Sequence, residues 1–178
     1  VVSNNKNGGV RKRADKLGVP FIYFSGPWEA DEYRRIIEKY QAEWVALSGW
    51  LKLIKGLDPR RTFNIHPAPL PRFGGKGMYG RYVHEAVVEA FKKKEIKFSA
   101  VCMHFVTEKY DEGPIFFKYP VLIREDDTPE SLAERVNKIE HGWQSFITNL
   151  VVYRQISWDG KNPKSLIVPP WYNFHVIF

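Results

Sequence analysis

The sequence has almost no cysteine and no long apolar run. Its single cysteine, Cys102, lies in the segment SAVCMHFV without a neighbouring cationic residue, which favours a buried thiol over a nucleophile. One cysteine excludes a disulfide within the chain and a cysteine-based zinc site. No stretch approaches the roughly 18 apolar residues of a membrane span, and the first residues, VVSNNKNGG, lack the layout of a secretory signal. We therefore expect a soluble, cytoplasmic protein without a membrane partner or a bound metal.

Apolar and aromatic residues, by contrast, are abundant. Hydrophobic residues make up 44% of the 178 residues and aromatic residues 15%, contents that exclude a disordered or low-complexity chain. A chain of this length is typical of one domain with its own core. We expect residues 1–178 to form a single domain.

The net charge is positive, +7 at pH 7. Such a charge would suit a nucleic acid, or a small phosphorylated or polycarboxylate substrate. However, the basic clusters at residues 11–16 and 92–94 fall in segments predicted to be helical, where a solvated face explains them at least as well. The charge alone therefore identifies no partner.

Short β-rich segments alternate with longer amphipathic segments, which is typical of an α/β fold with a mostly parallel, twisted sheet flanked by helices. The last long segment has the clearest start, because Thr128 can cap a helix and Pro129 suits its first position. In the tail, Asp159 and Gly160 are typical of a hairpin turn. The patterns predict strands at 1–3, 20–24, 44–48, 62–66, 98–106 and 115–121, and helices at 10–17, 29–40, 51–57, 82–93 and 129–153.

Asn64 and His66 are the first candidates for chemistry. They lie at the end of the strand predicted at residues 62–66, and side chains two positions apart on a strand point to the same face. Three prolines within residues 67–71 stiffen the exit from this strand, at the edge of the sheet where α/β proteins bind ligands. An amide and an imidazole held there could donate hydrogen bonds to an oxyanion. A turn-forming Asn64 and a structural His66 would explain the same spacing.

Asp111 is a candidate partner for the histidine. It lies in the turn TEKYDEGP between two predicted strands. A carboxylate near an imidazole favours the protonated imidazole, so Asp111 could support His66. Aspartate is also common in such turns for purely local reasons, and from the residues alone both interpretations stay open.

A resemblance favours the catalytic interpretation. The segments FNIHPAPLPRFGGKGMYG, VHEAVV, HFVTEKYDEGPIFF, DDTPESLAERVNKIEH and WDGKNPKSLIVPP resemble phosphoribosylglycinamide formyltransferases, which belong to the folate-dependent formyltransferases. The similarity extends over nearly the whole chain. Asn-Ile-His-Pro with a later Asp-x-Gly-Pro turn is highly specific for folate-dependent formyltransferases as a group, and less specific for the substrate.

The resemblance implies a Rossmann-like formyltransferase fold and transfer of a formyl group from the co-substrate 10-formyltetrahydrofolate to glycinamide ribonucleotide in purine biosynthesis. It implies small-molecule partners; nucleic acid is not expected, and the oligomeric state stays open. Matched position by position, Asn64 and His66 would be catalytic, with Asp111 supporting His66. The implied folate-binding residues are Leu51, Lys52, Leu53, Ile54, Asn64, Val106 and Thr107, and the implied nucleotide-binding residues are Pro67 and Glu140.

The chain departs from the family's pattern at its start. Members usually begin with one more strand and a Gly/Ser/Asn-rich turn that holds the substrate phosphate, whereas residues 1–3 resemble the family's second strand. We therefore expect the first strand and the phosphate loop to be absent from residues 1–178. The loop GGKGMYG lacks the Walker spacing and is expected to cover the nucleotide. His84 and His104 are expected to be structural.

Other members of the group are alternatives. Methionyl-tRNA formyltransferases and formyltetrahydrofolate hydrolases share the asparagine, histidine and aspartate. The first usually carry an additional C-terminal domain and the second an additional N-terminal one. A sugar-amine formyltransferase and a folate-binding protein without turnover are the remaining alternatives.

Overall fold

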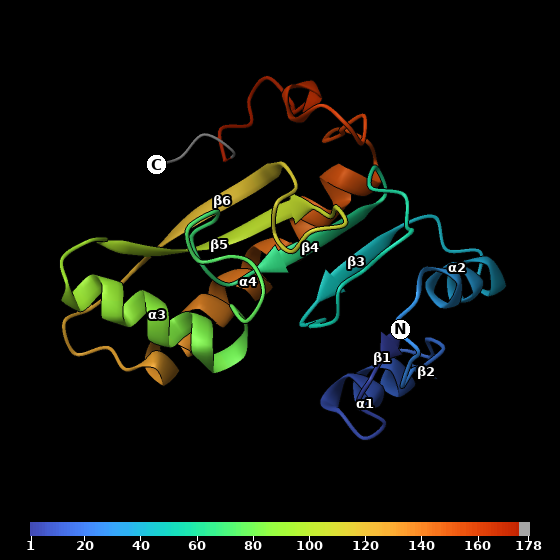
Figure 1. Cartoon of the computed structure of the whole chain (residues 1–178), viewed down its shortest axis with the longest axis horizontal. Coiled ribbons are helices and arrows are strands. Elements are labelled where there is room, and N and C mark those ends of the chain that lie inside the picture. Colours follow the sequence, from blue (N-terminus) through green and yellow to red (C-terminus); the bar gives the residue numbers. More distant parts are fainter. Residues whose placement is uncertain (175–178) are drawn as a thin grey trace.

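A computed structural model describes residues 1–174 and contains two separate sheets (Figure 1). The larger sheet has the strand order β3-β4-β5-β6, and the smaller sheet pairs β1 with β2. The strands are β1 (Val2–Ser3), β2 (Ile22–Tyr23), β3 (Val45–Ser48), β4 (Thr62–His66), β5 (Phe98–Phe105) and β6 (Ile115–Leu122). The helices beside them are α1 (Gly9–Lys16), α2 (Ala30–Lys39), α3 (Gly80–Lys92) and α4 (Pro129–Val152).

The prediction of an α/β fold is confirmed, but strand directions are more mixed than expected. β1 pairs with β2, and β3 with β4, in parallel. The pairs β4–β5 and β5–β6 are antiparallel. The connection between β5 and β6 is shorter than the crossover that parallel strands require, so these two strands form a hairpin.

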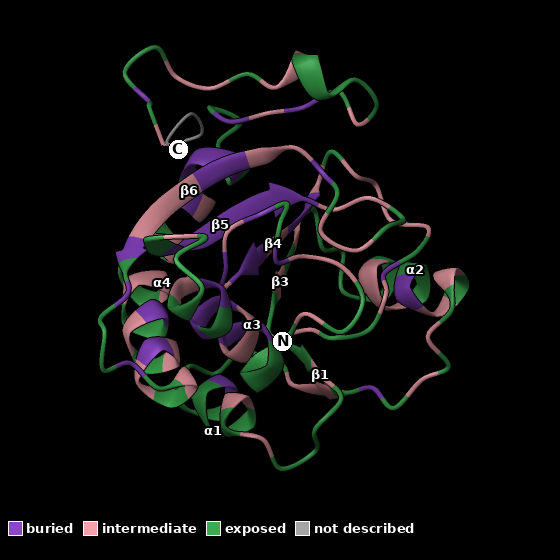
Figure 2. Cartoon of the chain, turned by 60° about the vertical axis from the view of Figure 1, so that its left-hand side comes forward, coloured by how far each residue is buried: buried purple, intermediate pink, exposed green. Residues whose placement is uncertain are grey.

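Helix α4 supports the larger sheet. Its start is a capping box in which Ser131 N donates to Thr128 Oγ1 at 3.2 Å and Thr128 N donates to Ser131 Oγ at 3.0 Å. The helix contacts β5 and β6 and packs against α3, and in Figure 1 it passes beneath the sheet. The buried residues of β4, β5 and α4 lie together in Figure 2 and form the main core.

A second, smaller core lies around α2. Phe24, Tyr33 and Ile54 are buried there, with Trp28 and Trp50 packed against them. The rings of Phe24 and Trp28 meet edge to face with centroids 5.0 Å apart, a favourable arrangement for aromatic pairs. This cluster joins α2 to the loop that leaves the end of β3.

The prediction of a short helix at residues 51–57 is wrong, because no helix forms there. Instead, side chains of α2 donate hydrogen bonds to backbone carbonyl oxygens in this segment. Tyr33 Oη donates to Leu53 O at 3.4 Å, and Arg34 Nε donates to Gly56 O at 2.9 Å. These long-range bonds offer the backbone an alternative to helical hydrogen bonds, and the segment stays an extended loop at the carboxyl end of β3.

The tail forms less regular structure than the predicted hairpin. A single antiparallel bridge joins Ser157 to Ile167, and a short 3-10 helix at Pro163–Ser165 lies between them. Further along, Tyr172 Oη donates to Phe116 O at 2.7 Å, which fixes the tail to the larger sheet. The tail therefore completes the main core, to which Ile156, Trp158 and Tyr172 belong.

Candidate active site

Strand β4 carries Asn64 and His66 on one face, at its carboxyl end. The intervening Ile65 and the preceding Phe63 are buried in the main core. Antiparallel pairing with β5 places Asn64 opposite His104, and His66 opposite Cys102. The strand thus presents two polar side chains from a backbone held on both sides.

Asp111 reaches the same place from the turn after β5. Its own backbone has a φ of 56°, in the left-handed region, which aspartate tolerates better than most residues. Two positions further on, a Cβ atom at Gly113 would clash with the carbonyl oxygen of Phe105. Gly113 therefore allows the turn to fold tightly against β5, and this accounts for the spacing Asp-x-Gly in the sequence.

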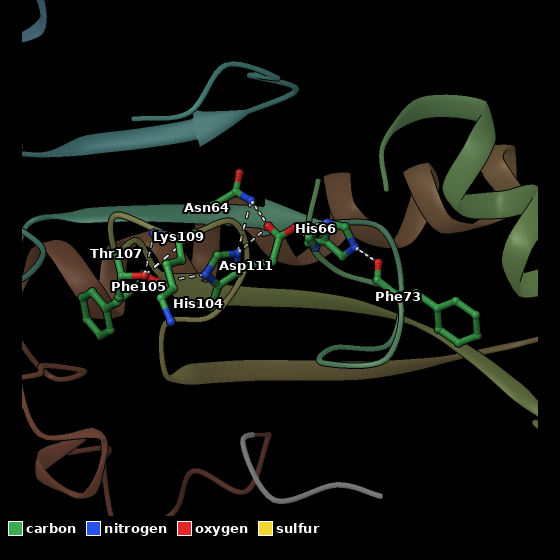
Figure 3. Close-up of polar contacts among 9 residues, drawn as sticks. Asn64, His66, Phe73, His104, Phe105, Thr107, Lys109 and Asp111 are labelled. Atoms are coloured by element: carbon green, nitrogen blue, oxygen red, sulfur yellow. Dashed lines mark hydrogen bonds and ion pairs between the residues drawn. The ribbon is translucent and has the colours of Figure 1, made fainter. Parts of the chain in front are cut away.

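The carboxylate of Asp111 lies among nitrogen atoms of neighbouring residues (Figure 3). Gly75 N donates to Oδ2 at 2.9 Å, Asn64 Nδ2 donates to Oδ1 at 3.4 Å, and His104 Nε2 lies 3.3 Å from Oδ1. Burial opposes ionisation of Asp111, but the contacts with His104, His66 and the Gly75 amide together hold the pKa of Asp111 below its usual value. The site therefore contains a fixed negative charge at neutral pH.

His66 is almost fully enclosed, with only 4% of its surface exposed. Its Nε2 donates to Phe73 O at 2.8 Å, because a carbonyl oxygen can only accept. Its Nδ1 lies 3.8 Å from Asp111 Oδ2. Burial lowers the pKa of His66 and outweighs the opposing effects of Asp111 and the Phe73 carbonyl. The imidazole is therefore neutral at pH 7, with its Nδ1 on the side of Asp111.

His104 is part of this cluster, which sequence reasoning missed. Its Nδ1 donates to Phe105 O at 2.8 Å. In the neutral ring, Nε2 is then the acceptor, and Asn64 Nδ2 lies 3.2 Å away from it. The expectation that His104 is only structural rested on its position inside a strand; the signal that could have found it is the pairing of β4 with β5.

Two hollows adjoin the cluster. One, of about 50 Å³, is lined by Asn64, His104 and Asp111 among others. The second, of about 270 Å³, lies between the loop after β3 and the turn after β5, with Gly160 at its edge. Both are lined by Ile54, Val106 and Thr107, so they are neighbours and can receive one ligand.

The remaining residues expected to bind substrates lie in different surroundings. Lys52 and Leu53 line the smaller hollow. Leu51 is 47% exposed and lines neither hollow, and Pro67 also lies outside their linings. Glu140 lies on α4, where burial raises the pKa of its carboxyl and Asn137 Nδ2 donates to it at 3.3 Å. No hydrogen bond or ion pair recorded in residues 1–174 joins Glu140 to Asn64, His66 or Asp111.

Comparison with known proteins assigns this arrangement to a family. Residues 1–149 match the model of the formyl transferase family. The chain belongs to the formyl transferases. This match covers both strands of the site and the turn that carries Asp111.

Individual relatives agree with this assignment. A chloroplastic phosphoribosylglycinamide formyltransferase of Arabidopsis thaliana is 37% identical over 169 residues, which are 89% of this chain and 56% of that protein. Phosphoribosylglycinamide formyltransferase of Bacillus subtilis is 31% identical over 153 residues, or 80% of this chain and 74% of that protein. The chain spans about half the length of the plant relatives that it matches.

A solved structure shares the fold. Glycinamide ribonucleotide transformylase 1 from Symbiobacterium toebii superimposes with a TM-score of 0.78 at 26% identity, over 95% of this chain and 79% of that one. A formyltetrahydrofolate deformylase from Pseudomonas syringae also superimposes, with a TM-score of 0.72 at 20% identity. Because the fold is common to both, the identity of the acceptor has to be argued from the site.

Proposed function

We propose that this protein transfers the formyl group of 10-formyltetrahydrofolate to the primary amine of phosphoribosylglycinamide, in purine biosynthesis. The observation that carries the proposal is the convergence of Asn64, His66 and Asp111 on one point beside a hollow at the carboxyl end of β4. The names of the relatives support the choice of substrates. A cytoplasmic location is part of the proposal, although two plant relatives are named as chloroplastic. Within residues 1–174, no helix is long and apolar enough to cross a membrane.

The folate would enter through the two neighbouring hollows. The larger one, of about 270 Å³, is lined by the apolar side chains of Ile54, Leu57, Pro59 and Val106, together with Thr62, Thr107 and Glu108, which suits a flat ring system with a polar edge. The smaller one would then hold the formyl group next to Asn64 and Asp111. Lys52, Leu53, Ile54, Val106 and Thr107 are the residues that we propose to contact the folate, with Leu51 at the rim.

The reaction proposed is a direct transfer. The amine nitrogen attacks the formyl carbon, and the carbonyl electron pair moves to the oxygen, giving a tetrahedral oxyanion. The Asn64 N–H that now points to Asp111 Oδ1, the longer of the two contacts of this nitrogen, would donate to that oxygen instead. When the carbonyl re-forms, the bond to the folate nitrogen breaks, and a proton passes from the attacking nitrogen to the nitrogen that leaves. No covalent bond to the protein is needed.

The charges of the site suit this sequence of steps. Burial lowers the pKa of His66, which favours the neutral ring. An oxyanion beside it adds a negative charge to that of Asp111, and nearby negative charge favours imidazolium. His66 would therefore take a proton from the attacking nitrogen as the intermediate forms and pass it to the nitrogen that leaves. To do so, one ring nitrogen has to leave its present partner, and the bond to Phe73 O is the one that competes with substrate.

His104 would act through Asn64. Its ring fixes the side-chain amide at 3.2 Å, and Asp111 holds the same nitrogen at 3.4 Å. The contact with His104 occupies one N–H of Asn64 and orients the other before substrate arrives, which is the condition for effective stabilisation of an oxyanion. We propose that His104 is a positioning residue for Asn64.

The nucleotide would extend away from this point. We propose that the Glu140 carboxylate binds the ribose hydroxyls and that Pro67 lies along the nucleotide. Burial keeps the pKa of Glu140 above its usual value, and hydrogen bonds from two hydroxyls would offset that burial.

A formyl-transfer assay tests the proposal. Purified protein is given 10-formyltetrahydrofolate with phosphoribosylglycinamide, a nucleotide-sugar amine, formylatable methionyl-tRNA, or no acceptor. We expect product only with phosphoribosylglycinamide. Release of formate without an acceptor would indicate hydrolysis, and product with another amine would replace the proposed acceptor. Folate binding without any turnover would contradict the proposed activity.

A further inference from the structure

Lys118 of β6 lies in one row with Cys102 of β5 and His66 of β4. The pairing of the strands places His66 opposite Cys102, and Cys102 opposite Lys118. Residues directly opposite each other in an antiparallel pair share one face of the sheet. The side chain of Lys118 therefore lies on the face that carries the candidate active site.

The partner of the Lys118 ammonium is a backbone carbonyl. Nζ donates to Leu70 O at 3.3 Å, and within residues 1–174 no backbone N–H is recorded as a donor to this oxygen. Burial raises the pKa of the neighbouring Cys102 to about 11, so the thiol is neutral and supplies no opposite charge. Lys118 thus supplies a charge-assisted hydrogen bond to a loop.

This loop, residues 67–75, is anchored to the sheet at Leu70. The side chain of Leu70 is 2% exposed and belongs to one buried cluster with Cys102. Beyond it the chain turns back on itself, and Phe73 N donates to Pro69 O at 3.0 Å. The place of this turn over the sheet therefore depends on where Leu70 is held.

The far side of the loop contacts two residues of the site. Phe73 O accepts from His66 Nε2 at 2.8 Å, and Gly75 N donates to Asp111 Oδ2 at 2.9 Å (Figure 3). A Cβ atom at Gly74 would lie 3.0 Å from Asp111 Cβ, so the loop packs closely against the turn that carries this carboxylate. The His66 ring and the Asp111 carboxylate thus both depend on the position of the loop.

We infer that Lys118 is a positioning residue for His66 and Asp111, acting through the loop that it holds at Leu70. The inference rests on the proposed function, because it concerns the same site. A partly buried lysine could instead await an anionic substrate, but Lys118 lines neither of the two hollows. An apolar side chain in its place would leave Leu70 O without this donor, and the loop would lose its polar contact with β6.

Amide hydrogen exchange without substrate tests whether Lys118 holds the loop. Lys118→Met keeps the length of the side chain and removes its donors. We expect it to speed exchange at the Gly75 amide about tenfold or more and to leave the amide of Met103, inside β5 between β4 and β6, unchanged. Lys118→Arg keeps a cationic donor and should keep exchange at Gly75 close to wild type. The control Lys97→Met removes an exposed lysine and should change neither amide.

Steady-state kinetics tests whether the loop positions the site. We expect Lys118→Met to lower kcat about tenfold, in the direction expected for a misplaced catalytic group, with KM for folate unchanged. Lys118→Arg should recover most of kcat, and Lys97→Met should retain all of it. If Lys118→Met does not fold, Lys118→Thr takes its place, because it removes the donor with a residue that favours strands.

Four results would overturn the inference. The first is wild-type exchange at Gly75 in Lys118→Met, and the second is faster exchange at Gly75 and Met103 alike, which would indicate a general loss of stability. The others are an unchanged kcat despite faster exchange at Gly75, and an equal loss of kcat in Lys118→Met and Lys118→Arg. The exchange measurement needs neither folate nor acceptor. A wild-type protein without formyl transfer would therefore contradict the proposed function, while exchange at Gly75 would still decide whether Lys118 holds the loop.

Discussion

The side-chain nitrogen of Asn64 lies 3.2 Å from Nε2 of His104, directly across the antiparallel pair β4–β5. Because His104 Nδ1 is already bonded to Phe105 O, the ring cannot turn to offer Nε2 elsewhere without losing a buried hydrogen bond. The carbonyl oxygen of Phe105 thus fixes the His104 ring, and the ring in turn sets the orientation of the Asn64 amide. The reaction proposed for this site depends on that orientation.

Removal of either proposed catalytic side chain should abolish most turnover. We expect Asn64→Ala and His66→Ala each to lower kcat by roughly 10² to 10³, the effect of losing one oxyanion donor, with little change in folate affinity. The matched control is Asn149→Ala on the exposed face of α4. Steady-state kinetics and folate titration give the result, and a variant that keeps more than about half of kcat would remove that residue from the mechanism.

Replacement of His104 should reduce kcat without weakening substrate binding. We expect His104→Phe to lower kcat by about tenfold to 100-fold, the scale of a misplaced catalytic group, with KM for folate unchanged. His104→Gln can still accept from Asn64 and should recover part of kcat. If the two variants lose kcat equally while retaining wild-type stability, the ring does not act by positioning Asn64.

Asp111 should raise the proton affinity of His66. We expect Asp111→Asn to lower the pKa of His66 further, because the charge of Asp111 opposes the effect of burial. Titration of the His66 ring by NMR measures this, with Glu112→Gln as the control at a neighbouring exposed carboxylate. An unchanged or higher pKa in Asp111→Asn would separate Asp111 from His66.

Stability should fall between pH 6.5 and about 4 because of His84. Burial, and next the charge of His66, lower the pKa of His84 to about 4. Between that value and the ordinary 6.5, the unfolded chain binds a proton that the folded chain does not, so stability decreases as pH falls through this window and levels off below it. At 1.4 kcal/mol per pKa unit the loss is about 3 kcal/mol.

Urea unfolding at several pH values tests this. In His84→Phe the slope between pH 6.5 and 4 should flatten, leaving the smaller contribution of His66, whose pKa is lowered in the same direction. The control is His141→Phe, at an exposed position of α4, which should keep the wild-type slope. A His84 variant as pH-sensitive as the wild type would assign the effect to other groups.

Local signals in the sequence were sufficient for much of the fold, whereas the choice of the proposed site residues also needed the family resemblance. β4 has the predicted bounds, and α4 begins at the predicted residue, because a proline-stiffened exit and a capping sequence act within a few residues of the chain. Asn64 and His66 share a face for an equally local reason, the two-residue period of a strand. Asp111 was selected because its Asp-x-Gly-Pro turn resembles that of the family, and the close approach of Gly113 to Phe105 explains the spacing of this turn.

Tertiary structure decided the rest, because it depends on partners distant in sequence. Residues 51–57 have a helical pattern, yet Tyr33 and Arg34 of α2 hold their carbonyl groups in an extended loop. The direction of β5 and its register with β4 bring His104 to Asn64, and a shift of one residue would have turned that ring to the other face. Asp111 alone would raise the pKa of His66, but burial lowers it. The loop at Phe73 that encloses the His66 ring contacts it only in the folded chain.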